Sequence, residues 1–249
     1  GKAVPEIKSN VKNAKVGITL NLNTATPASD SEHDKKECAF YDAQFNRLYL
    51  DPLYKQKYPE LLFDRLLEKE DIKQSDLNFI QEGDLKIIST PTDFLGVNYY
   101  SRAIIRDESI DENLNENHKI SMGPKTDFGW EVYPRGIYDL LKRLQDEYNV
   151  NEIMITENGC SYGDAPDENN KVNDIKRVEY HRSHIEQILL AVDEGIPCTG
   201  YFAWSLLDNF EWAEGYSQRF GLIWVDFESL ERVPKESYYW YQNFLKSQK

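Results

Sequence analysis

The chain has 249 residues, enough for one large domain or two small ones, with 29% charged and 40% hydrophobic residues. Its formal net charge of −14 argues against binding to nucleic acid or to an anionic membrane surface, because both need clustered Lys and Arg. It has no apolar run near the roughly 20 residues of a membrane span, no signal-peptide pattern and only three scattered cysteines, so a reducing, cytoplasmic setting is the default expectation.

Four apolar runs predict the strands of the fold. They are near-continuous rather than alternating, which is typical of strands buried on both faces of a parallel sheet. The predicted strands are 16–22, 93–100, 152–158 and 199–207. Helical patterns are found at 59–70, 134–148, 174–195 and 234–247. Strands that alternate with helices predict a parallel α/β fold.

Two polar segments, 105–128 and 160–173, are predicted to be long loops because they are rich in Asp, Asn and Gly. Both follow predicted strand ends, and in α/β folds that side of the sheet carries the active site. The chain shows neither an internal repeat nor a linker that would divide it. A single unit is therefore expected.

Polar and aromatic side chains gather where the predicted strands end. Seen alone, an acid such as Glu157 at a strand tip is more often a helix N-cap or a surface group. Four strand ends that all offer amide, phenol, carboxylate or indole groups instead predict one convergent site at the top of a barrel. Amides and carboxylates beside aromatic rings match a polyhydroxylated ligand. These residues are Asn21, Asn23, Asn98, Tyr99, Tyr100, Glu157, Asn158, Trp204, Ser205, Asp208, Glu211 and Trp212.

No other type of site competes with this one in the sequence. There is no Gly-rich phosphate loop, metal-ligand cluster or nucleophilic Ser motif, and no cofactor is expected. His181 and His184, three residues apart on a predicted helix, could nominally hold a metal ion. Neither has a further ligand candidate nearby in the sequence, so both are predicted to face solvent and no metal site is expected.

Two sequence blocks make the pattern specific: ITENG at 155–159 and FAWSLLDNFEWAEGYSQRFGLIWVDF at 202–227. They resemble the two signature regions of glycoside hydrolase family 1, the retaining β-glucosidases. The segments DFLGVNYYSR (93–102), GWEVYP (129–134) and PKESYYWYQNF (234–244) support the resemblance, which runs in order along nearly the whole chain. It implies a (β/α)8 TIM barrel and an enzyme that hydrolyses terminal non-reducing β-D-glucosyl residues.

The resemblance assigns the bond-breaking chemistry to the ends of two strands. Glu157 would be the nucleophile that attacks the anomeric carbon, and Tyr100 would hold it by a hydrogen bond. Asn98 would lie beside it near the sugar 2-hydroxyl. Tyr99 is predicted to point into the packing, because neighbours on a strand face opposite ways.

The same resemblance assigns sugar binding to five aromatic and acidic residues. Trp204 would form the floor of the sugar subsite, and Glu211 would accept hydrogen bonds from hydroxyls around O4 and O6. Trp212 would donate from its indole N–H. Trp130 and Phe220 would line the rim.

The second carboxyl group that a retaining hydrolase needs is missing from the sequence. The family places its acid/base in an Asn-Glu-Pro motif at the end of the fourth strand, and no such motif occurs here. The segment NENHK at 115–119 shares only two letters with it, and Glu211 is already assigned to the sugar. Residues 1–249 are therefore expected to be the C-terminal half of one barrel, about the last four βα units. The unpaired edge strands of its sheet predict either an N-terminal half-barrel chain as partner or self-association.

Two functions stay open at this point. The first is an enzyme component that hydrolyses a β-glucoside or a short β-linked oligosaccharide once a half with the acid/base is present. The second is a non-catalytic half-barrel that binds sugar or serves in assembly. Neutral sugars are favoured over 6-phosphorylated ones, because Glu211 and Trp212 are kept and Gln218 and Phe220 follow, where phosphate-binding members carry Lys and Tyr. Preference among glucoside, galactoside and fucoside stays open.

Overall fold

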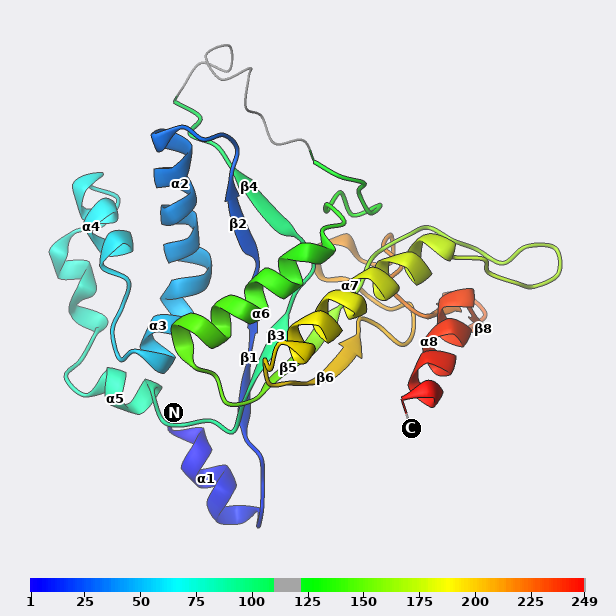
Figure 1. The fold of residues 1–249 in the computed structure, drawn as a ribbon, viewed down its shortest axis with the longest axis horizontal. Helices are drawn as coiled ribbons and strands as arrows, with labels where there is room; N and C mark the ends of the chain where they lie inside the picture. The colour runs from blue at the N-terminus through cyan, green and yellow to red at the C-terminus, as the bar shows by residue number, and fades with distance from the viewer. Residues whose placement is uncertain (110–121, 249) are drawn as a thin grey trace.

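A four-stranded parallel sheet organises the molecule, as the sequence predicts. The structure is a computed structural model that describes residues 1–109 and 122–248 (Figure 1). The segment NENHK and part of the predicted loop 105–128 lie outside the described residues. The strand order is β1-β3-β5-β6 and every neighbouring pair is parallel. The strands are β1 (Gly17–Asn21), β3 (Phe94–Asn98), β5 (Ile153–Asn158) and β6 (Cys198–Ala203).

The four predicted helices are present with small changes at their ends. They are α4 (Glu60–Glu68), α6 (Pro134–Tyr148), α7 (Ile175–Asp193) and α8 (Glu236–Ser247). Helix α8 begins two residues later than predicted, because the chain before it forms a strand that ends at Pro234. Strand β6 ends at Ala203 rather than at 207, because Ser205 leaves the sheet. The Ser205 N–H donates to the Phe220 carbonyl, in the loop that follows, at 3.1 Å.

Several elements were not predicted. Two small sheets lie outside the main one: a parallel pair of β2 (Thr24–Pro27) with β4 (Arg102–Ile105), and an antiparallel pair of β7 (Ile223–Val225) with β8 (Arg232–Pro234). Figure 1 shows β2 and β4 leading away from the ends of β1 and β3. The additional helices are α1 (Ala3–Asn10), α2 (Glu32–Asp42), α3 (Leu48–Tyr54) and α5 (Asp84–Ile88), with a π-helix at Ala43–Arg47 and 3-10 turns at Gln74–Phe79 and Trp212–Glu214.

One face of the sheet is packed and forms the main core. Helices α6 and α7 lie side by side across this face (Figure 1). The two central strands place fully buried side chains there, and each fully buried Leu or Ile contributes roughly 1.5–3 kcal/mol relative to exposure. The strand residues involved are Leu95, Val97, Ile153 and Ile155, and the helix residues are Ile137, Leu140, Leu141, Leu144, Ile188 and Ala191.

The opposite face of the sheet is lined by small and polar groups that touch across strands. A Cβ added to Gly96 on β3 would lie 2.4 Å from Thr19 Oγ1 on β1 and 2.9 Å from Thr156 Cγ2 on β5. Glycine is therefore required there by close approach of the neighbouring strands. Such inward-facing groups are what a barrel interior presents. The fold is accordingly part of a (β/α)8 barrel, with four of its strands in one open sheet.

The edges of the sheet depart from the prediction that all four strands are buried on both faces. In the described residues, β1 and β6 each pair with only one strand of this sheet. Thr19 and Asn21 on β1 are exposed, and Phe202 on β6 is 57% exposed. The near-continuous apolar pattern therefore predicts burial correctly for the central strands alone. The edge strands have the same pattern, but part of their surface is exposed.

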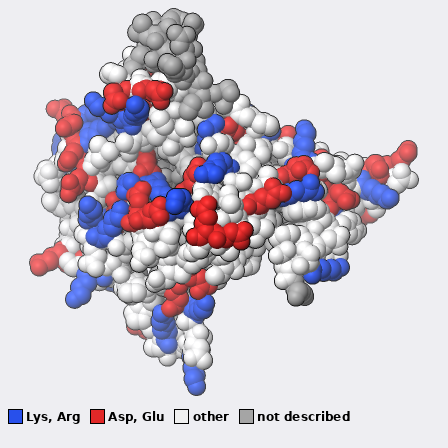
Figure 2. Space-filling view, in the orientation of Figure 1, with Lys and Arg blue, Asp and Glu red and all other residues white. Residues whose placement is uncertain are grey.

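Charged residues of both signs mix on the face shown in Figure 2. Several of them form ion pairs between helices, such as Arg143 with Asp42 and Arg47 with Glu147. Among the helices of the described residues, none combines the length and apolarity that crossing a bilayer requires.

Candidate active site

The eight predicted site residues line one cavity of about 650 Å³ at the carboxyl ends of the central strands. Parallel strands bring their carboxyl ends to the same edge of the sheet, so residues far apart in sequence meet there. The eight are Asn98, Tyr100, Trp130, Glu157, Trp204, Glu211, Trp212 and Phe220. The structure therefore brings together the eight residues that the resemblance assigned to the site. Of the wider set at the predicted strand ends, Tyr99, Asn158, Ser205 and Asp208 do not line the cavity.

Glu157 and Tyr100 form the closest polar contact in the cavity wall. The Tyr100 hydroxyl donates to Glu157 Oε2 at 2.5 Å. Burial, and then this hydrogen bond, raises the pKa of Tyr100 well above its usual value, so the hydroxyl keeps its proton and stays a donor. Tyr99 points the other way, as predicted, and donates to the Tyr133 carbonyl at 2.8 Å from a fully buried position.

Asn98 and Gly159 complete the wall around Glu157. Asn98 lies opposite Glu157 in the strand register, and its Oδ1 accepts from the Thr156 hydroxyl at 2.7 Å. A Cβ added to Gly159 would lie 1.8 Å from the Trp204 carbonyl oxygen, so only glycine allows the β5 and β6 ends to approach this closely. The Asn-Gly step after Glu157 thus carries Trp204 into the same cavity.

Glu211 is the second carboxyl group facing this region. Burial raises the pKa of Glu211, the indole of Trp204 opposes that rise by a hydrogen bond, and the charge of Glu157 adds to it. Trp212, in the short 3-10 turn that follows, is 87% exposed. Its indole is available to a ligand rather than packed into the protein.

Aromatic rings build the opposite wall. The Trp130 ring centroid lies 5.0 Å from that of Tyr100 and 6.1 Å from that of Phe220. Phe128 extends the group, with its centroid 4.2 Å from Trp130. Phe220 is buried, so it supports the wall from within rather than standing at an open rim as predicted.

A third carboxyl group, Glu131, lines the cavity but is held in an ion pair. Arg102 donates to it twice, at 2.7 and 3.0 Å, and the Gly123 N–H donates at 2.6 Å. Burial opposes ionisation of Glu131, but these donors outweigh burial and hold its pKa below the usual value. Glu131 therefore stays a carboxylate and cannot serve as a proton donor at neutral pH.

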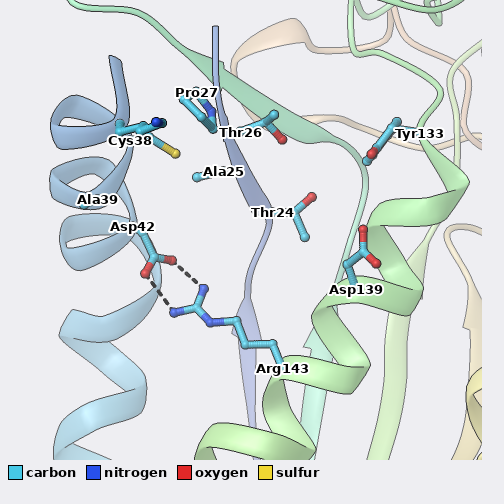
Figure 3. Close-up of a pocket in the computed structure, with 11 residues that line it drawn as sticks. Thr24, Ala25, Thr26, Pro27, Cys38, Ala39, Asp42, Tyr133, Asp139 and Arg143 are labelled. Carbon is cyan, nitrogen blue, oxygen red and sulfur yellow. Dashed lines mark hydrogen bonds and ion pairs between the residues drawn. The ribbon is translucent and has the colours of Figure 1, made fainter. Parts of the chain in front are cut away.

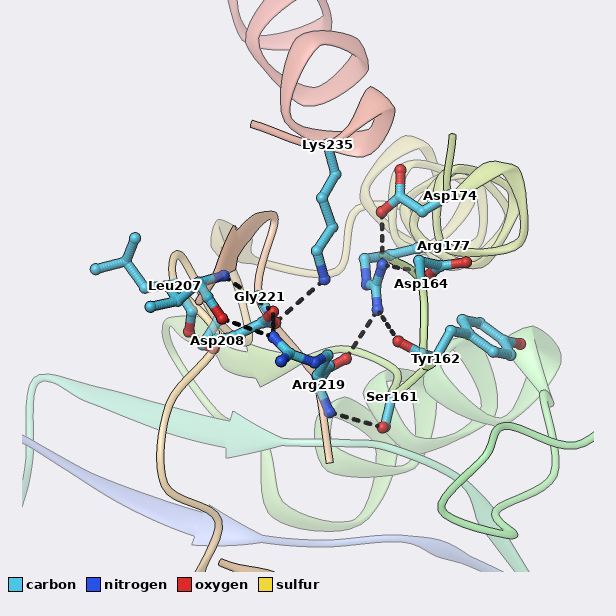
Figure 4. Close-up of polar contacts among 12 residues, drawn as sticks. Ser161, Tyr162, Asp164, Asp174, Arg177, Leu207, Asp208, Arg219, Gly221 and Lys235 are labelled. Atoms are coloured by element: carbon cyan, nitrogen blue, oxygen red, sulfur yellow. Dashed lines mark hydrogen bonds and ion pairs between the residues drawn. The ribbon is translucent and has the colours of Figure 1, made fainter. Parts of the chain in front are cut away.

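A buried ion cluster anchors the loop between β6 and β7 that carries Glu211, Trp212 and Phe220 (Figure 4). The Asp208 carboxylate accepts from Gly221 N–H at 2.8 Å and from Lys235 Nζ at 3.1 Å. Its other oxygen accepts from Arg219 Nη1 at 2.7 Å. Removing one partner of such a buried group costs about 3–5 kcal/mol, because a charge is left uncompensated.

The same cluster joins this loop to the loop that follows Glu157. Arg177 on α7 is fully buried and donates to the Asp174 carboxylate at 2.5 Å. Its other nitrogen donates to the Arg219 carbonyl at 2.8 Å and to the Tyr162 carbonyl at 3.2 Å (Figure 4). One guanidinium therefore holds the two loops at a fixed spacing.

A second cavity, of about 470 Å³, lies between α2, β2 and α6 (Figure 3). None of the eight predicted site residues lines it. Asp42 and Arg143 face each other across it and pair at 2.5 and 2.7 Å. Burial raises the pKa of Cys38 to about 11, which leaves a protonated thiol at neutral pH. This cavity does not hold a group prepared for catalysis.

A family model described as Glycosyl hydrolase family 1 matches residues 1–249. The chain belongs to this family. It is 43% identical over 248 residues to Beta-glucosidase A of Thermotoga maritima, covering 99% of this chain and 54% of that protein. It is 41% identical over 256 residues to a 1,4-beta-D-glucan glucohydrolase of Thermotoga neapolitana, again covering 99% and 54%.

Solved structures agree with the sequence comparison. A beta-glucosidase from Exiguobacterium marinum matches with a TM-score of 0.88 at 37% identity, covering 100% of this chain and 56% of that one. The family 1 glucosidase of Thermotoga maritima matches with a TM-score of 0.84 at 41% identity, covering 98% and 54%. The chain spans about half the length of the relatives that it matches.

Sequence reasoning missed several residues of this family 1 cavity. Tyr41 and Phe45 come from α2 and the π-helix, neither of which was predicted, and Arg102 from β4. Glu131 stands inside the quoted segment GWEVYP, but its carboxylate was not considered. Proximity to Trp130 in that segment was the signal that could have identified it.

The prediction that His181 and His184 face solvent is wrong. Both side chains have no exposed surface. The helix face that carries them turns toward the sheet. Tyr201 Oη on β6 lies 2.7 Å from His181 Nδ1, and the carbonyl of Tyr180, one turn earlier in α7 itself, lies 2.7 Å from His184 Nδ1. Burial lowers the pKa of His181 to about 3 and of His184 to about 4, so both are neutral at pH 7. Among the described residues, no group of three or more His, Cys, Asp or Glu could hold a metal ion.

Proposed function

We propose that residues 1–249 are the C-terminal half of a family 1 barrel and supply the nucleophile and much of the glucose subsite of a retaining β-glucosidase. The observation that carries this proposal is the 2.5 Å hydrogen bond from Tyr100 to Glu157 in a cavity that Trp204 and Glu211 also line. The relatives named as beta-glucosidases support the reaction and the substrate class.

In the proposed mechanism, the Glu157 carboxylate attacks the anomeric carbon of a terminal β-D-glucosyl residue. The glycosidic bond breaks as the new ester bond forms, and the departing oxygen takes a proton from a general acid. Water then attacks the anomeric carbon, gives its proton to the same group and releases Glu157. Tyr100 orients the attacking oxygen, and the aromatic wall beside it limits access of water.

Sugar binding falls to the remaining residues of the cavity. Trp204 offers a flat apolar face, which matches the C–H face of a pyranose ring. Asn98, beside Glu157, would bind near the sugar 2-hydroxyl, and Glu211 would accept hydrogen bonds from O4 and O6. The indole N–H of Trp212, being exposed, would donate to the outer hydroxyls.

The general acid must come from a second half-barrel. Glu131 is held as a carboxylate by Arg102, and Glu211 is committed to the sugar. No Asn-Glu-Pro motif occurs in the sequence. A retaining site needs its two carboxyl groups about 5–5.5 Å apart, so the missing half must place its acid directly opposite Glu157.

An apolar groove beside the β6 edge supports docking of that half. Its volume is about 420 Å³, and its walls come from the β6 edge, the loop after it and α8. Phe202, Leu206 and Leu245 line it with 57%, 59% and 47% of their surfaces exposed. Apolar surface of this kind beside an unpaired strand favours a further strand and helix, or a second copy of the chain.

The alternative function is a non-catalytic half-barrel that binds sugar or serves in assembly. The lack of an acid/base motif in the chain favours it for the chain alone. The intact surroundings of Glu157 favour the enzyme, since a sugar-binding module has no use for a carboxylate bonded to a tyrosine hydroxyl.

Reconstitution tests the proposal. This chain would be co-expressed with the part of Beta-glucosidase A of Thermotoga maritima that it does not match; the complex is called the assembled barrel. We expect hydrolysis of an aryl β-glucoside, and covalent labelling of Glu157 by a 2-fluoro-glucoside, found by peptide mass spectrometry. Glu157→Gln is the control and should take no label. Label on Glu211 would overturn the assignment of the nucleophile, and a complex that binds glucose without hydrolysis would favour the alternative.

A further inference from the structure

A buried hydrogen-bond network lies directly behind the Glu157–Tyr100 pair, on the side away from the cavity. Its centre is Asn158, which has no exposed surface. Because neighbours on a strand face opposite ways, Asn158 points toward α7 while Glu157 points into the cavity. The network uses His181, which the proposed chemistry does not require.

The direction of each hydrogen bond in the network is fixed by one backbone carbonyl. The Tyr99 carbonyl can only accept, and it lies 2.8 Å from the Asn158 side chain, so the amide nitrogen Nδ2 must face it. Oδ1 of Asn158 therefore faces the Tyr201 hydroxyl at 2.8 Å, and that hydroxyl must donate. Its remaining contact, 2.7 Å from His181 Nδ1, is then a bond donated by the imidazole. His181 is thus the neutral Nδ1–H tautomer.

The network also reaches Tyr100. Asn158 Nδ2 donates to the Tyr180 hydroxyl at 3.2 Å, and that hydroxyl donates to the Tyr100 carbonyl at 3.0 Å. The carbonyls of Tyr99 and Tyr100 are therefore both held by side chains of the network. These two carbonyls belong to the peptide groups on either side of the Tyr100 Cα, so they set the direction in which its ring leaves the strand.

Resting on the proposed function, we propose that Asn158 and Tyr201 are positioning residues for the Glu157–Tyr100 pair, with His181 holding the Tyr201 hydroxyl from behind. None of the three lines the cavity. They fix the ends of β3, β5 and β6 in one arrangement, so that the Tyr100 hydroxyl and the Glu157 carboxylate meet at 2.5 Å. A misplacement of about 1 Å in reacting groups can cost 10²-fold in rate.

The burial of His181 supports this role. A protonated imidazole would have to donate from Nε2 as well, and this atom is buried without a hydrogen-bond partner. Burial, and then the positive charge of Arg177, lowers the pKa of His181 to about 3. The imidazole therefore keeps one donor and one direction throughout the neutral pH range.

Amide hydrogen exchange tests the proposal in the chain alone. Tyr201→Phe removes only the hydroxyl that joins His181 to Asn158. It should speed exchange of the amides of Tyr99 and Trp204, which bond to the Glu157 and Asn158 carbonyls, by about five- to tenfold. The amide of Leu95, lower in the sheet, should not change. The control is Tyr138→Phe, which removes a hydroxyl that is bonded to Glu194 at 2.6 Å and takes no part in the network.

Kinetics in the assembled barrel give the second readout. Tyr201→Phe should lower kcat by roughly 10- to 100-fold with KM for an aryl glucoside changed less than twofold, because the sugar contacts stay in place. Tyr138→Phe should change neither. In an Asn158→Ala background, Tyr201→Phe should add no further loss, since both act through the same bond.

The outcomes separate this inference from the proposed function. If the unmodified assembled barrel fails to label Glu157, the proposed function fails, and the exchange experiment still decides the inference. If labelling succeeds but Tyr201→Phe matches Tyr138→Phe in both exchange and kcat, the inference is wrong. Uniform acceleration of all sheet amides would also overturn it. Should Tyr201→Phe not fold, Tyr180→Phe replaces it, because it frees the Tyr100 carbonyl and predicts the same fall in kcat.

Discussion

The central strands and the edge strands of this sheet differ in how many of their groups are paired or buried within the chain. At the ends of β3 and β5, every polar group described above has a partner, from Thr156 with Asn98 to Tyr100 with Glu157. At the edges, Phe202 on β6 is exposed and Thr19 on β1 faces solvent. Under the proposed function, the chain itself would therefore position the nucleophile, whereas the general acid and the cover of the sheet edges would come from another half-barrel.

This difference separates two requirements of catalysis that are usually met by one fold. Nucleophile geometry depends on hydrogen bonds within a few ångströms, and these lie in the centre of the sheet. In the proposed mechanism, protonation of the leaving group would depend on a residue beyond the edge of the sheet. Each prediction below changes one of these regions and leaves the other unchanged.

The largest effect should be the loss of turnover when the chain is assayed alone, without a second half-barrel at the sheet edges. Without a general acid, the isolated chain should lose roughly 10²–10⁴-fold in turnover relative to the assembled barrel. The deficit should be smallest for a dinitrophenyl glucoside, whose leaving group needs no proton, and largest for cellobiose. Parallel assays of both substrates would measure it. Light scattering should find dimers or larger species of the isolated chain; a monomer that hydrolyses cellobiose would refute the comparison.

The next largest effect is a loss of stability at low pH, which tests the burial of two histidines on α7. His181 and His184 have pKa values of about 3 and 4 when folded, because burial disfavours their charged forms, against about 6.5 when unfolded. The unfolded chain therefore binds more protons between these limits, and stability is lost as pH falls from 6.5 towards 4. Together the two histidines should lower the free energy of unfolding by up to about 5 kcal/mol at pH 4.5.

Urea titrations at pH 6.5 and 4.5 would measure this loss. His184→Gln cannot titrate and should remove about half of the histidine contribution. Equal losses of stability in the unmodified chain and in His184→Gln would contradict the burial of His184.

A smaller effect is expected in the loop after the β6 edge. Glu211→Ala in the assembled barrel should lower kcat/KM for a glucoside by more than tenfold, because a hydrogen bond to a charged group contributes on the order of 1.5–3 kcal/mol. The loss should be larger for a glucoside than for a galactoside, whose O4 points elsewhere. Glu214→Ala, on the same loop and exposed, is the control. A neutral Glu211→Ala would mean that this loop does not bind the sugar.

The smallest effect should come from one hydroxyl in the centre. Tyr100→Phe keeps the ring against Trp130 but removes the bond to Glu157, so kcat should fall by about tenfold with little change in the free energy of unfolding. Steady-state kinetics across pH, with Tyr138→Phe as control, would measure it. Unchanged kcat at every pH would show that Tyr100 serves the packing alone.

Much of this arrangement could be predicted from the sequence, for identifiable reasons. Buried parallel strands leave an apolar run that can be read locally, so β3 and β5 were found. Glu157 lies at the end of the β5 run and Trp204 directly after the β6 run, and their places in the two signature blocks assigned them to the site.

The parts that were missed depend on contacts far apart in the sequence. Helix α2 buries only Asp34 and Cys38, so it shows no periodic apolar face, and Tyr41 with Phe45 beyond it could not be placed in the cavity. His181 and His184 are polar residues on a helix, and their burial depends on partners such as Tyr201 that only the folded chain supplies. The edge strands have apolar patterns that predict burial, but the other three strands of the sheet do not bury them.

The aromatic wall of the cavity has an optical consequence. Among the four rings of Phe128, Trp130, Tyr100 and Phe220, five of the six pairs have centroids 4.2 to 6.4 Å apart. Transitions of rings held this closely couple, and they give circular dichroism bands in the near ultraviolet that vanish when the rings move freely. The isolated chain thus contains its own chromophore for the integrity of the site. Folding of the cavity, docking of a second half and entry of a sugar can each be followed by that signal before any bond is broken.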